Sequence, residues 1–263
     1  MLSCRDNSRV MQTTGNTILI TGGGSGIGRG LAEAFHALGN QVIIAGRRRG
    51  VLQAAAAANP GMASIDFDIE NADGIRAFVS RVAAEHPSLN VLINNAGIMR
   101  RENLQVQQED LADAEAVITT NLLGPIRLTA ALLPLLMKQD YSAIMNVSSG
   151  LAFVPLSLTP TYCATKAAVH SYTQSLRYQL RGAPTDVIEL IPPYVQTELL
   201  DGANDPRAMP LAAFIEEVMG ILKNNSEITE ICVENVKRLR FAAEGGHYDA
   251  VFKGFNDAML GGH

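Results

Sequence analysis

The sequence predicts an α/β protein built on one Rossmann-type, doubly wound parallel sheet of about seven strands, with helices on both faces. Short β-rich runs alternate along the 263 residues with stretches whose apolar residues recur at helical spacing. A glycine-rich turn separates the first such run from the first helical stretch, as in dinucleotide-binding folds. No repeat or low-complexity linker interrupts this rhythm. We therefore expect a single domain over residues 17–263.

The expected strands and helices follow from this alternation. Seven apolar runs are assigned to strands: Thr17–Ile20, Gln41–Ala45, Ser64–Phe67, Val91–Ile93, Ala143–Val147, Asp186–Ile191 and, more weakly, Ile228–Val233. The first helix is expected to bury one apolar stripe and to end at Gly39; the stripe is Ile27, Leu31, Phe35 and Leu38. Val51–Ala58 is assigned to a second helix.

The segment from Leu199 to Lys223 interrupts the pattern. A loop-like stretch ends near Pro206, and an apolar helical stripe follows. Two interpretations stand at this point: a surface helix that packs on the core, or a mobile lid over a substrate cleft.

Composition excludes several classes of function. Hydrophobic residues make up 47% and the formal net charge is -5, which argues for a large core and against a surface for nucleic acid or anionic membrane. Three scattered cysteines provide neither a disulfide framework nor a zinc site, so no metal is expected. Residues 1–16 have no signal-peptide core and are expected to form a flexible tail, and Leu128–Met137 is too short to cross a bilayer. These features are typical of a soluble cytoplasmic protein.

The turn after the first strand is suited to a pyrophosphate. It reads TGGGSGIG over Thr21–Gly28 and leads directly into the first helix. Glycines allow a sharp turn and a close approach of the backbone, and the helix N-terminus presents free N–H groups to the anion. The candidate cofactor-binding residues here are Gly22, Ser25, Gly26, Ile27 and Gly28.

The end of the second strand favours NADP over NAD. A dinucleotide site of this type usually has a carboxylate there, which binds the ribose hydroxyls. The chain has Ala45-Gly46-Arg47-Arg48 instead. A guanidinium such as that of Arg47 can bind a 2′-phosphate through paired N–H donors.

Tyr162 and Lys166 form a possible proton-transfer pair. At i and i+4 on a helix the two side chains share one face. A free phenol has a pKa near ~10, and a nearby ammonium group favours the phenolate. The same spacing also arises by chance, so the pair gains meaning only from the motifs around it.

Those motifs together resemble the classical short-chain dehydrogenase/reductase family over nearly the whole chain. In chain order they are Thr21–Gly28, Asp68-Ile69, Asn94-Asn95-Ala96-Gly97, Asn121, Asn146-Val147-Ser148-Ser149, and Tyr162 with Lys166. The resemblance implies hydride transfer between NADP(H) and a small-molecule carbonyl or secondary alcohol. An alternative from another class is an NADP-binding regulator or scaffold without turnover.

The resemblance also implies catalytic roles. Tyr162 would act as acid and base, while Lys166 would lower its pKa and hold the nicotinamide ribose. Ser149 is the preferred catalytic serine because it lies 13 residues before Tyr162, and Ser148 is second. Asn121 would anchor a water that links Lys166 to solvent. Pro125 supports this role, since it has no N–H for the Asn121 carbonyl in a regular helix.

Further cofactor contacts follow from the same resemblance. Asp68 and Ile69 would contact the adenine, and Asn95 and Gly97 would flank the cofactor. Val195 and Thr197 match the positions expected to contact the nicotinamide carboxamide.

The chain departs from the family pattern at Pro193, where many members have glycine. The double proline Pro192-Pro193 and the later Pro206–Pro210 resemble a poorly characterised bacterial branch of the family.

The substrate and the assembly are less defined. Phe153, Leu156, Tyr194 and Phe214 are candidate lining residues for a moderately apolar substrate. Leu122–Met137 is apolar nearly all round, which favours a subunit interface in a homodimer or homotetramer.

Overall fold

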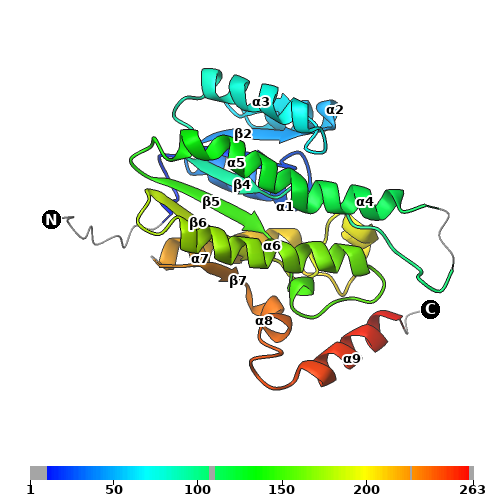
Figure 1. Cartoon of the computed structure of the whole chain (residues 1–263). Coiled ribbons are helices and arrows are strands. Elements are labelled where there is room, and N and C mark those ends of the chain that lie inside the picture. The colour runs from blue at the N-terminus through cyan, green and yellow to red at the C-terminus, as the bar shows by residue number, and fades with distance from the viewer. Residues whose placement is uncertain (1–10, 107–109, 226, 261–263) are drawn as a thin grey trace.

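Seven parallel strands form one sheet in the order β3-β2-β1-β4-β5-β6-β7 (Figure 1). The computed structural model describes residues 11–106, 110–225 and 227–260. The strands are β1 Thr17–Thr21, β2 Gln41–Gly46, β3 Ala63–Asp66, β4 Val91–Asn94, β5 Ser142–Val147, β6 Thr185–Ile191 and β7 Glu230–Cys232. The predicted fold class is confirmed, and all seven predicted strands lie in this sheet.

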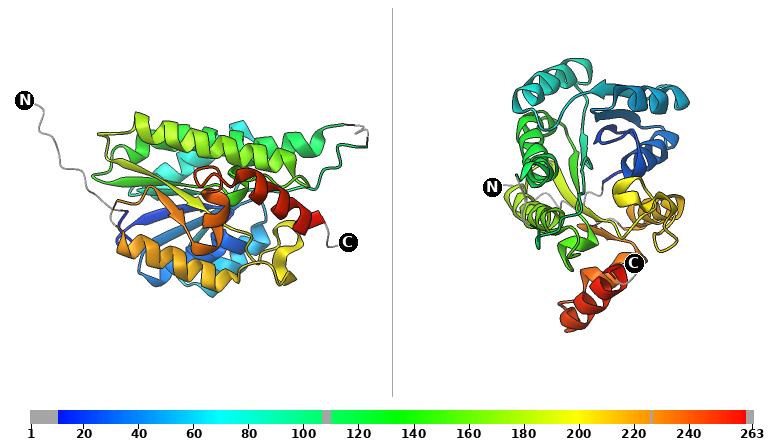
Figure 2. Two further views of the ribbon diagram at one scale, coloured as in Figure 1. Left: turned by 90° about the horizontal axis from the view of Figure 1, so that it is seen from below. Right: turned by 90° about the vertical axis from the view of Figure 1, so that its right-hand side faces the viewer.

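Helices cover both faces of the sheet (Figure 2). The α-helices are α1 Gly26–Ala37, α2 Arg49–Ala58, α3 Ala72–Glu85, α4 Ala112–Ile118, α5 Gly124–Leu136, α6 Pro160–Gln179, α7 Leu211–Asn224, α8 Glu234–Arg240 and α9 Tyr248–Leu260. Helices α1, α2 and α7 pack on one face, and α3, α5 and α6 pack on the other. A π-helical turn at Thr119–Leu123 joins α4 to α5, and short 3-10 turns lie at Gly150–Ala152 and Leu199–Asn204.

The central strands are apolar on both sides because each face is buried. On β1, Ile18 and Ile20 contact the core under α1 and α7, whereas Leu19 contacts the core under α3 and α5. All three are fully buried. This two-sided burial explains why these strands read as continuous apolar runs rather than as alternating ones.

The sheet reverses its winding between β1 and β4, which are hydrogen-bonded neighbours. In open sheets of this kind, the crevice beyond the carboxyl ends of the strands at the reversal is the usual ligand site. Thr21 and Asn94 end these two strands, so the fold places the glycine-rich turn and the Asn94–Gly97 motif side by side.

The N-terminal segment is more ordered than expected. Met11 is only 2% exposed and belongs to the core under α1. The Asn16 backbone N–H donates to Asn40 Oδ1 at 2.9 Å. The expectation of a flexible tail is therefore wrong for residues 11–16, and residues 1–10 lie outside the described part of the chain.

Two further expectations are corrected on the face covered by α1. Leu38 caps α1 and is 45% exposed, so it is not part of the buried stripe. Phe214 and Val218 on α7 are fully buried against the core that α1 covers. Helix α7 is therefore a core-packing helix, and a lid role remains a prediction only for the loop that precedes it.

The helical run Ala112–Leu136 is long and apolar enough to cross a membrane by length and composition. Its inner face is instead part of the protein core, where Leu128, Leu132 and Leu136 are fully buried against the sheet and α3. We therefore interpret this run as a helix that packs on the core of the fold.

Replacing Phe35 by Ala should destabilise the fold by about 3–5 kcal/mol, because a fully buried ring leaves a cavity under α1. Leu38→Ala, three residues further along and largely exposed, should change stability by less than about 0.5 kcal/mol. Urea unfolding followed by circular dichroism measures both. Equal losses for the two variants would contradict this account of α1.

Candidate active site

A cavity of about 520 Å³ opens at the carboxyl ends of the strands. Thirteen of the predicted site residues line it: Gly22, Ser25, Gly26, Ile27, Arg47, Ile69, Asn95, Gly97, Ser149, Tyr162, Lys166, Val195 and Thr197. Gly28, Asp68 and Asn121 lie outside this lining. The fold thus brings the glycine-rich turn and the Tyr162 region, far apart in sequence, to one continuous cavity.

The glycine-rich turn is held in a conformation that suits glycine. Gly22 and Gly26 have φ of 66° and 53°, values that side chains rarely allow. A Cβ on Gly28 would lie 2.4 Å from the Gly22 carbonyl oxygen and 2.3 Å from Asn95 Nδ2. Gly28 therefore allows α1 to pack closely on the turn and on Asn95, and it does not form the cavity wall.

Asn95 connects the turn to the next strand along the sheet. Its Nδ2 donates to the Thr21 carbonyl at 3.0 Å, and its backbone N–H donates to Thr21 Oγ1 at 3.0 Å. These bonds fix the turn against the end of β4.

Two arginines line the end of the cavity next to β2. Arg47 pairs with Glu70 at 2.6 Å, while Arg48 donates to Ser25 Oγ at 2.7 Å and pairs with Glu198 at 3.3 Å. Arg48 thus lies over the glycine-rich turn, a placement that sequence reasoning missed in favour of Arg47. The sequence contained a signal for Arg48, because it directly follows Arg47 at the end of the second strand.

The predicted adenine contacts separate in the structure. Ile69 is buried in the cavity wall, next to the half-buried Phe67. Asp68 is exposed, and its Oδ1 accepts from the Glu70 backbone N–H at 3.0 Å. Contact between Asp68 and an adenine stays a prediction.

Tyr162 and Lys166 lie on the first turns of α6, facing the cavity. They are 6% and 4% exposed, and the ammonium lies 5.6 Å from the centre of the phenol ring. Lys166 Nζ donates to the Val147 carbonyl at 2.8 Å. Helical geometry, burial and this single bond fix the ammonium beside the phenol.

Burial, rather than the neighbouring cation, dominates the acidity of Tyr162. It raises the pKa of the phenol above its ordinary value, and the hydrogen bond with Ser149 opposes that rise. The net shift of the Tyr162 pKa is thus upward, opposite to the lowering predicted from Lys166, which is not among its causes. Burial also lowers the pKa of Lys166 to about 8, and the Glu189 carboxylate opposes this change.

The two candidate serines differ in their contacts. Ser149 hydrogen-bonds with Tyr162, and its Oγ also accepts from the Leu151 backbone N–H at 3.1 Å. Ser148 Oγ is buried and has no hydrogen-bond partner among the described residues. The geometry thus favours Ser149, the serine that the spacing to Tyr162 selects.

Asn121 lies in the π-helical turn behind the cavity. Its side chain exchanges two hydrogen bonds with the backbone of Ile98, at 2.8 and 2.9 Å. A second, small cavity of about 10 Å³ is bordered by Asn94, Asn121, Asn146 and Lys166. That volume is near the minimum for one water molecule, which supports the predicted water site.

The substrate end differs from the expectation. Leu156 and Tyr194 line the cavity, but Phe153 does not, and Phe214 belongs to the core on the α1 side. The wall is completed by residues near the C-terminus that sequence reasoning missed: Leu239, Phe255 and Met259. No motif marks these positions, because their role depends on where α8 and α9 lie.

Asn256 holds α9 against the site. It is 7% exposed, its Oδ1 accepts from the Ser157 N–H at 2.7 Å, and its Nδ2 donates to the Pro155 carbonyl at 3.1 Å. These bonds connect α9 to the loop that precedes Tyr162. The C-terminal helix is therefore a built part of the cavity wall.

The loop after β6 closes the remaining side. The Pro192 carbonyl accepts from the Gly150 N–H at 2.9 Å, and Val195 pairs with Met209 in an isolated bridge. Pro192, Pro193, Val195 and Thr197 all line the cavity. The double proline is thus accommodated within the site wall.

Comparison with known proteins agrees with this arrangement. The family model for short chain dehydrogenases matches residues 16–208. An uncharacterized oxidoreductase, DltE, of Bacillus subtilis is 39% identical over 252 residues, covering 94% of this chain and 98% of that protein.

Solved structures of short chain dehydrogenases are also similar to this chain. A short chain dehydrogenase from Burkholderia cenocepacia in complex with NADP has 25% identity and a TM-score of 0.78, covering 92% of this chain and 99% of the other. One from Sphingobium yanoikuyae in complex with NADPH has 27% identity and a TM-score of 0.75, covering 90% and 95%. The family match, the similarity to DltE and the motifs around the cavity agree. This chain belongs to the short-chain dehydrogenase family of oxidoreductases.

Proposed function

We propose that this protein transfers hydride between NADP(H) and a carbonyl or secondary alcohol, with Tyr162 as the acid and base. The observation that carries the proposal is the convergence of Tyr162, Ser149 and Lys166 on a cavity that continues to the glycine-rich turn. One binding site can then hold a dinucleotide with its reactive end beside the phenol.

The chemistry divides between the cofactor and the chain. The bound nicotinamide supplies or accepts the hydride. In reduction, Tyr162 donates its proton to the substrate oxygen, and its raised pKa keeps the phenol protonated at neutral pH. Ser149 would hydrogen-bond that oxygen as charge develops, a contribution of a few kcal/mol when the donor is preorganised, about 2.7–4.

Lys166 and Asn121 would support this step. The Lys166 ammonium lies between Tyr162 and the small cavity beside Asn121. It would hold the nicotinamide ribose and pass protons through a water in that cavity.

The cofactor is proposed to be NADP rather than NAD. Arg47 and Arg48 both line the cavity at the end of β2, and residues 45–48 contain no Asp or Glu; Glu70 and Glu198 pair with the two guanidinium groups from other segments. The related Burkholderia and Sphingobium structures hold NADP and NADPH.

The substrate is proposed to carry an apolar group beside the reacting carbon. Met99, Leu151, Leu156, Leu239, Phe255 and Met259 line the cavity on the α9 side. A cytoplasmic location is proposed with it, because the cytoplasm contains the NADP(H) pool; Cys163 and Cys232 are free thiols.

Tyr162→Phe should lower the rate of NADPH-dependent carbonyl reduction by about 100-fold or more, since the proton donor is lost. NADPH should still bind. Tyr178→Phe, on the same helix but 68% exposed, is the matched control and should keep wild-type rates. Turnover is measured as NADPH oxidation across a panel of carbonyls.

Two outcomes would reject the enzymatic proposal. Near-normal turnover by Tyr162→Phe on a good substrate would remove Tyr162 from the mechanism. NADPH binding by the wild type without turnover of any panel member would favour the regulator or scaffold instead.

Arg48→Ala and Arg47→Ala should each weaken NADPH binding by about tenfold, because a charge-assisted bond to the 2′-phosphate is lost. NADH affinity should stay unchanged. Arg49→Ala is the matched control, since Arg49 is exposed and does not line the cavity. NADPH fluorescence titration measures all three, and equal losses for NADPH and NADH would contradict the assignment.

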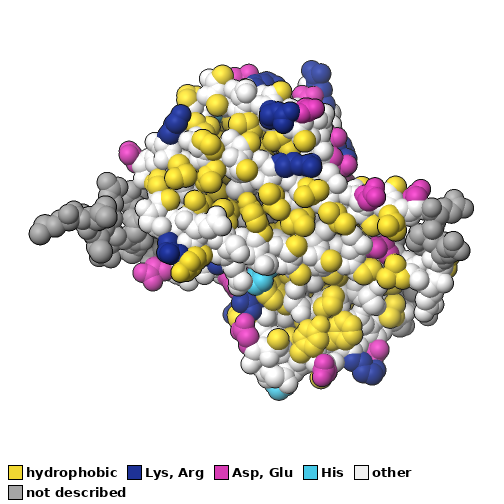
Figure 3. Space-filling view, viewed as in Figure 1, with side chains coloured by type: hydrophobic (Ala, Val, Ile, Leu, Met, Phe, Trp, Pro, Cys, Tyr) yellow, Lys and Arg dark blue, Asp and Glu magenta, His cyan; other side chains and the backbone are white. Residues whose placement is uncertain are grey.

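The α4–α5 face is proposed as a subunit interface. Ile118, Leu123 and Met137 are 39%, 38% and 46% exposed, although α5 buries its other side in the core. Figure 3 shows hydrophobic side chains spread over this face of the molecule. An isologous pairing would cover them.

Sedimentation velocity at micromolar concentration should therefore show a dimer or tetramer. Leu123→Arg should dissociate it, because a charge would be buried at the interface. Leu38→Arg, similarly exposed but at the end of α1 on the opposite face, should not. A monomeric wild type would refute the interface.

A further inference from the structure

A carboxylate lies fully buried beneath α6, next to the proposed active site. Glu189 on β6 has 0% exposure. It is in register with Asn146 on β5 and with Glu230 on β7, and Asn146 is in register with Asn94 on β4. These four residues form a polar row across four neighbouring strands, which the apolar pattern of the strands would not lead one to expect.

The other members of the row are engaged to different extents. Asn94 Nδ2 donates to Thr129 and to Asn146, whereas Asn94 Oδ1 has no partner among the described residues. Asn146 Nδ2 donates to Thr173 Oγ1 at 2.9 Å, and its Oδ1 accepts from Asn94 at 2.9 Å. Glu230 receives two bonds from Arg240, at 2.8 and 3.2 Å.

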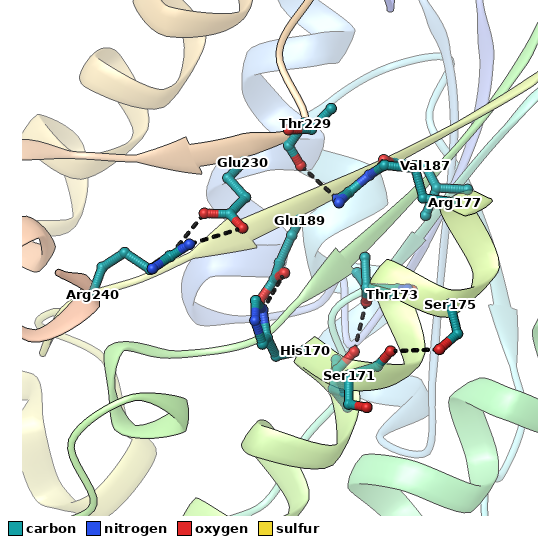
Figure 4. Close-up of polar contacts among 12 residues, drawn as sticks. His170, Ser171, Thr173, Ser175, Arg177, Val187, Glu189, Thr229, Glu230 and Arg240 are labelled. Carbon is teal, nitrogen blue, oxygen red and sulfur yellow. Dashed lines mark hydrogen bonds and ion pairs between the residues drawn. The ribbon is translucent and has the colours of Figure 1, made fainter. Parts of the chain in front are cut away.

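Only one of the two carboxylate oxygens of Glu189 has a polar partner among the described residues. Its Oε2 lies 2.8 Å from His170 Nδ1, and its Oε1 is buried without a partner among the described residues (Figure 4). A buried charge that lacks one of its bonds costs stability, so its presence calls for a reason.

The position of Lys166 suggests a reason, because this lysine lies on the same side of α6 as His170, the partner of Glu189. It precedes His170 by one turn of α6, on the same side of the helix. Its Nζ bonds the carbonyl of Val147, the residue after Asn146, and Val147 is in register with Leu190, the residue after Glu189. The ammonium and the Glu189 carboxylate therefore both lie beneath α6 on one face of the sheet. No direct ion pair joins them in the described part of the chain, but the carboxylate is near enough to raise the Lys166 pKa.

We propose that Glu189 is a positioning residue for the reaction, whose buried carboxylate keeps the Lys166 ammonium charged and in place beside Tyr162. The proposal rests on the proposed function. His170 would orient the carboxylate, and α6 would transmit any shift of His170 to Tyr162 and Lys166. The direction of the electrostatics agrees, because burial lowers the Lys166 pKa and Glu189 raises it.

The charges around Glu189 are balanced without a metal ion. His170, Glu189 and Glu230 place possible ligand atoms within 4.8 Å of one another. Both oxygens of Glu230, however, already bind the Arg240 guanidinium. Arg177 also lies close, with its guanidinium on the Thr229 carbonyl at 2.8 Å. Two cations thus face two carboxylates, which leaves a divalent ion poorly compensated.

Several titratable or charged groups face Glu189 and enter any pH dependence. They come from α6, β7 and α8, and they are Lys166, His170, Arg177, Glu230, Cys232 and Arg240. Of these, Lys166 has a pKa lowered to about 8, and Cys232 has a pKa raised to about 11. The titration is therefore followed at Lys166 itself, by a signal specific to lysine.

The direct test is a titration of Lys166 in the full-length protein. The chain has five lysines, so ¹³Cε-lysine labelling gives a simple spectrum, and a Lys166→Arg variant assigns the signal. Wild-type Lys166 should titrate near pH 8. In Glu189→Gln the midpoint should move to lower pH by about one unit, because an attractive charge is lost.

Three further variants separate charge from structure. Glu189→Met removes the charge with a side chain of similar volume, a change that buried ion pairs often tolerate, and should shift the midpoint as Glu189→Gln does. Glu189→Asp keeps the charge and should restore most of the wild-type value. Glu230→Gln, one strand further away, should shift it less than Glu189→Gln. An unmoved Lys166 midpoint in both neutral variants would overturn the proposal.

A second readout connects the titration to function. NADPH affinity of the wild type should fall as the pH rises through the Lys166 midpoint, and in Glu189→Gln the fall should begin at lower pH. Both measurements stand even if no carbonyl is turned over, so failure of the proposed function would be seen separately. Stoichiometric binding of Zn²⁺ by the wild type and not by Glu189→Gln would overturn the proposal by showing a metal site.

Discussion

The packing of α6 against the end of β5 is the contact on which the rest of the site depends. Lys166 reaches the Val147 carbonyl at 2.8 Å, and four residues earlier Tyr162 faces the same cavity. Because Ser149 follows Val147 by two residues, a single stretch of strand fixes both the ammonium and the serine. Displacement of α6 along the strand would separate all three groups at once.

Burial at this contact governs the chemistry as well as the packing. It raises the Tyr162 pKa and lowers that of Lys166, so each group is displaced toward its uncharged form. Hydrogen bonds and charges from other elements oppose these shifts: Ser149 for the phenol and Glu189 for the ammonium. The site therefore combines a dry environment with polar partners supplied from the sheet.

Much of the fold and the glycine-rich end of the site could be predicted from the sequence, because they depend on the local order of residues. The strands are apolar on both faces, and the turn at Gly22–Gly28 has to be glycine-rich, so both leave a signal in sequence. The Tyr162 pKa, by contrast, depends on how deeply α6 is buried. Spacing alone suggested that Lys166 would lower it, whereas burial raises it.

Other residues were predicted wrongly or not at all for a different reason. Phe255 and Met259 reach the cavity only through the long-range placement of α9, whereas Arg48 was passed over in favour of the neighbouring Arg47. Phe214 was mistaken for a lining residue because an apolar helical stripe looks the same whether it faces a ligand or the core. Met11 was assigned to a tail because a lone apolar residue carries no periodicity.

The attachment of α9 through Asn256 gives the cavity two ends that come from different parts of the chain. One end lies at the glycine-rich turn and the other at α9. The proposed nucleotide-binding end of the cavity, at the glycine-rich turn and the end of β2, lies within residues 16–208, the stretch that the family model matches. Part of the opposite wall comes from α9, which is attached to the rest through Asn256 and apolar side chains. A change of Phe255 or Met259 would alter that part of the wall and leave the glycine-rich turn in place, so the two ends of one cavity can vary independently.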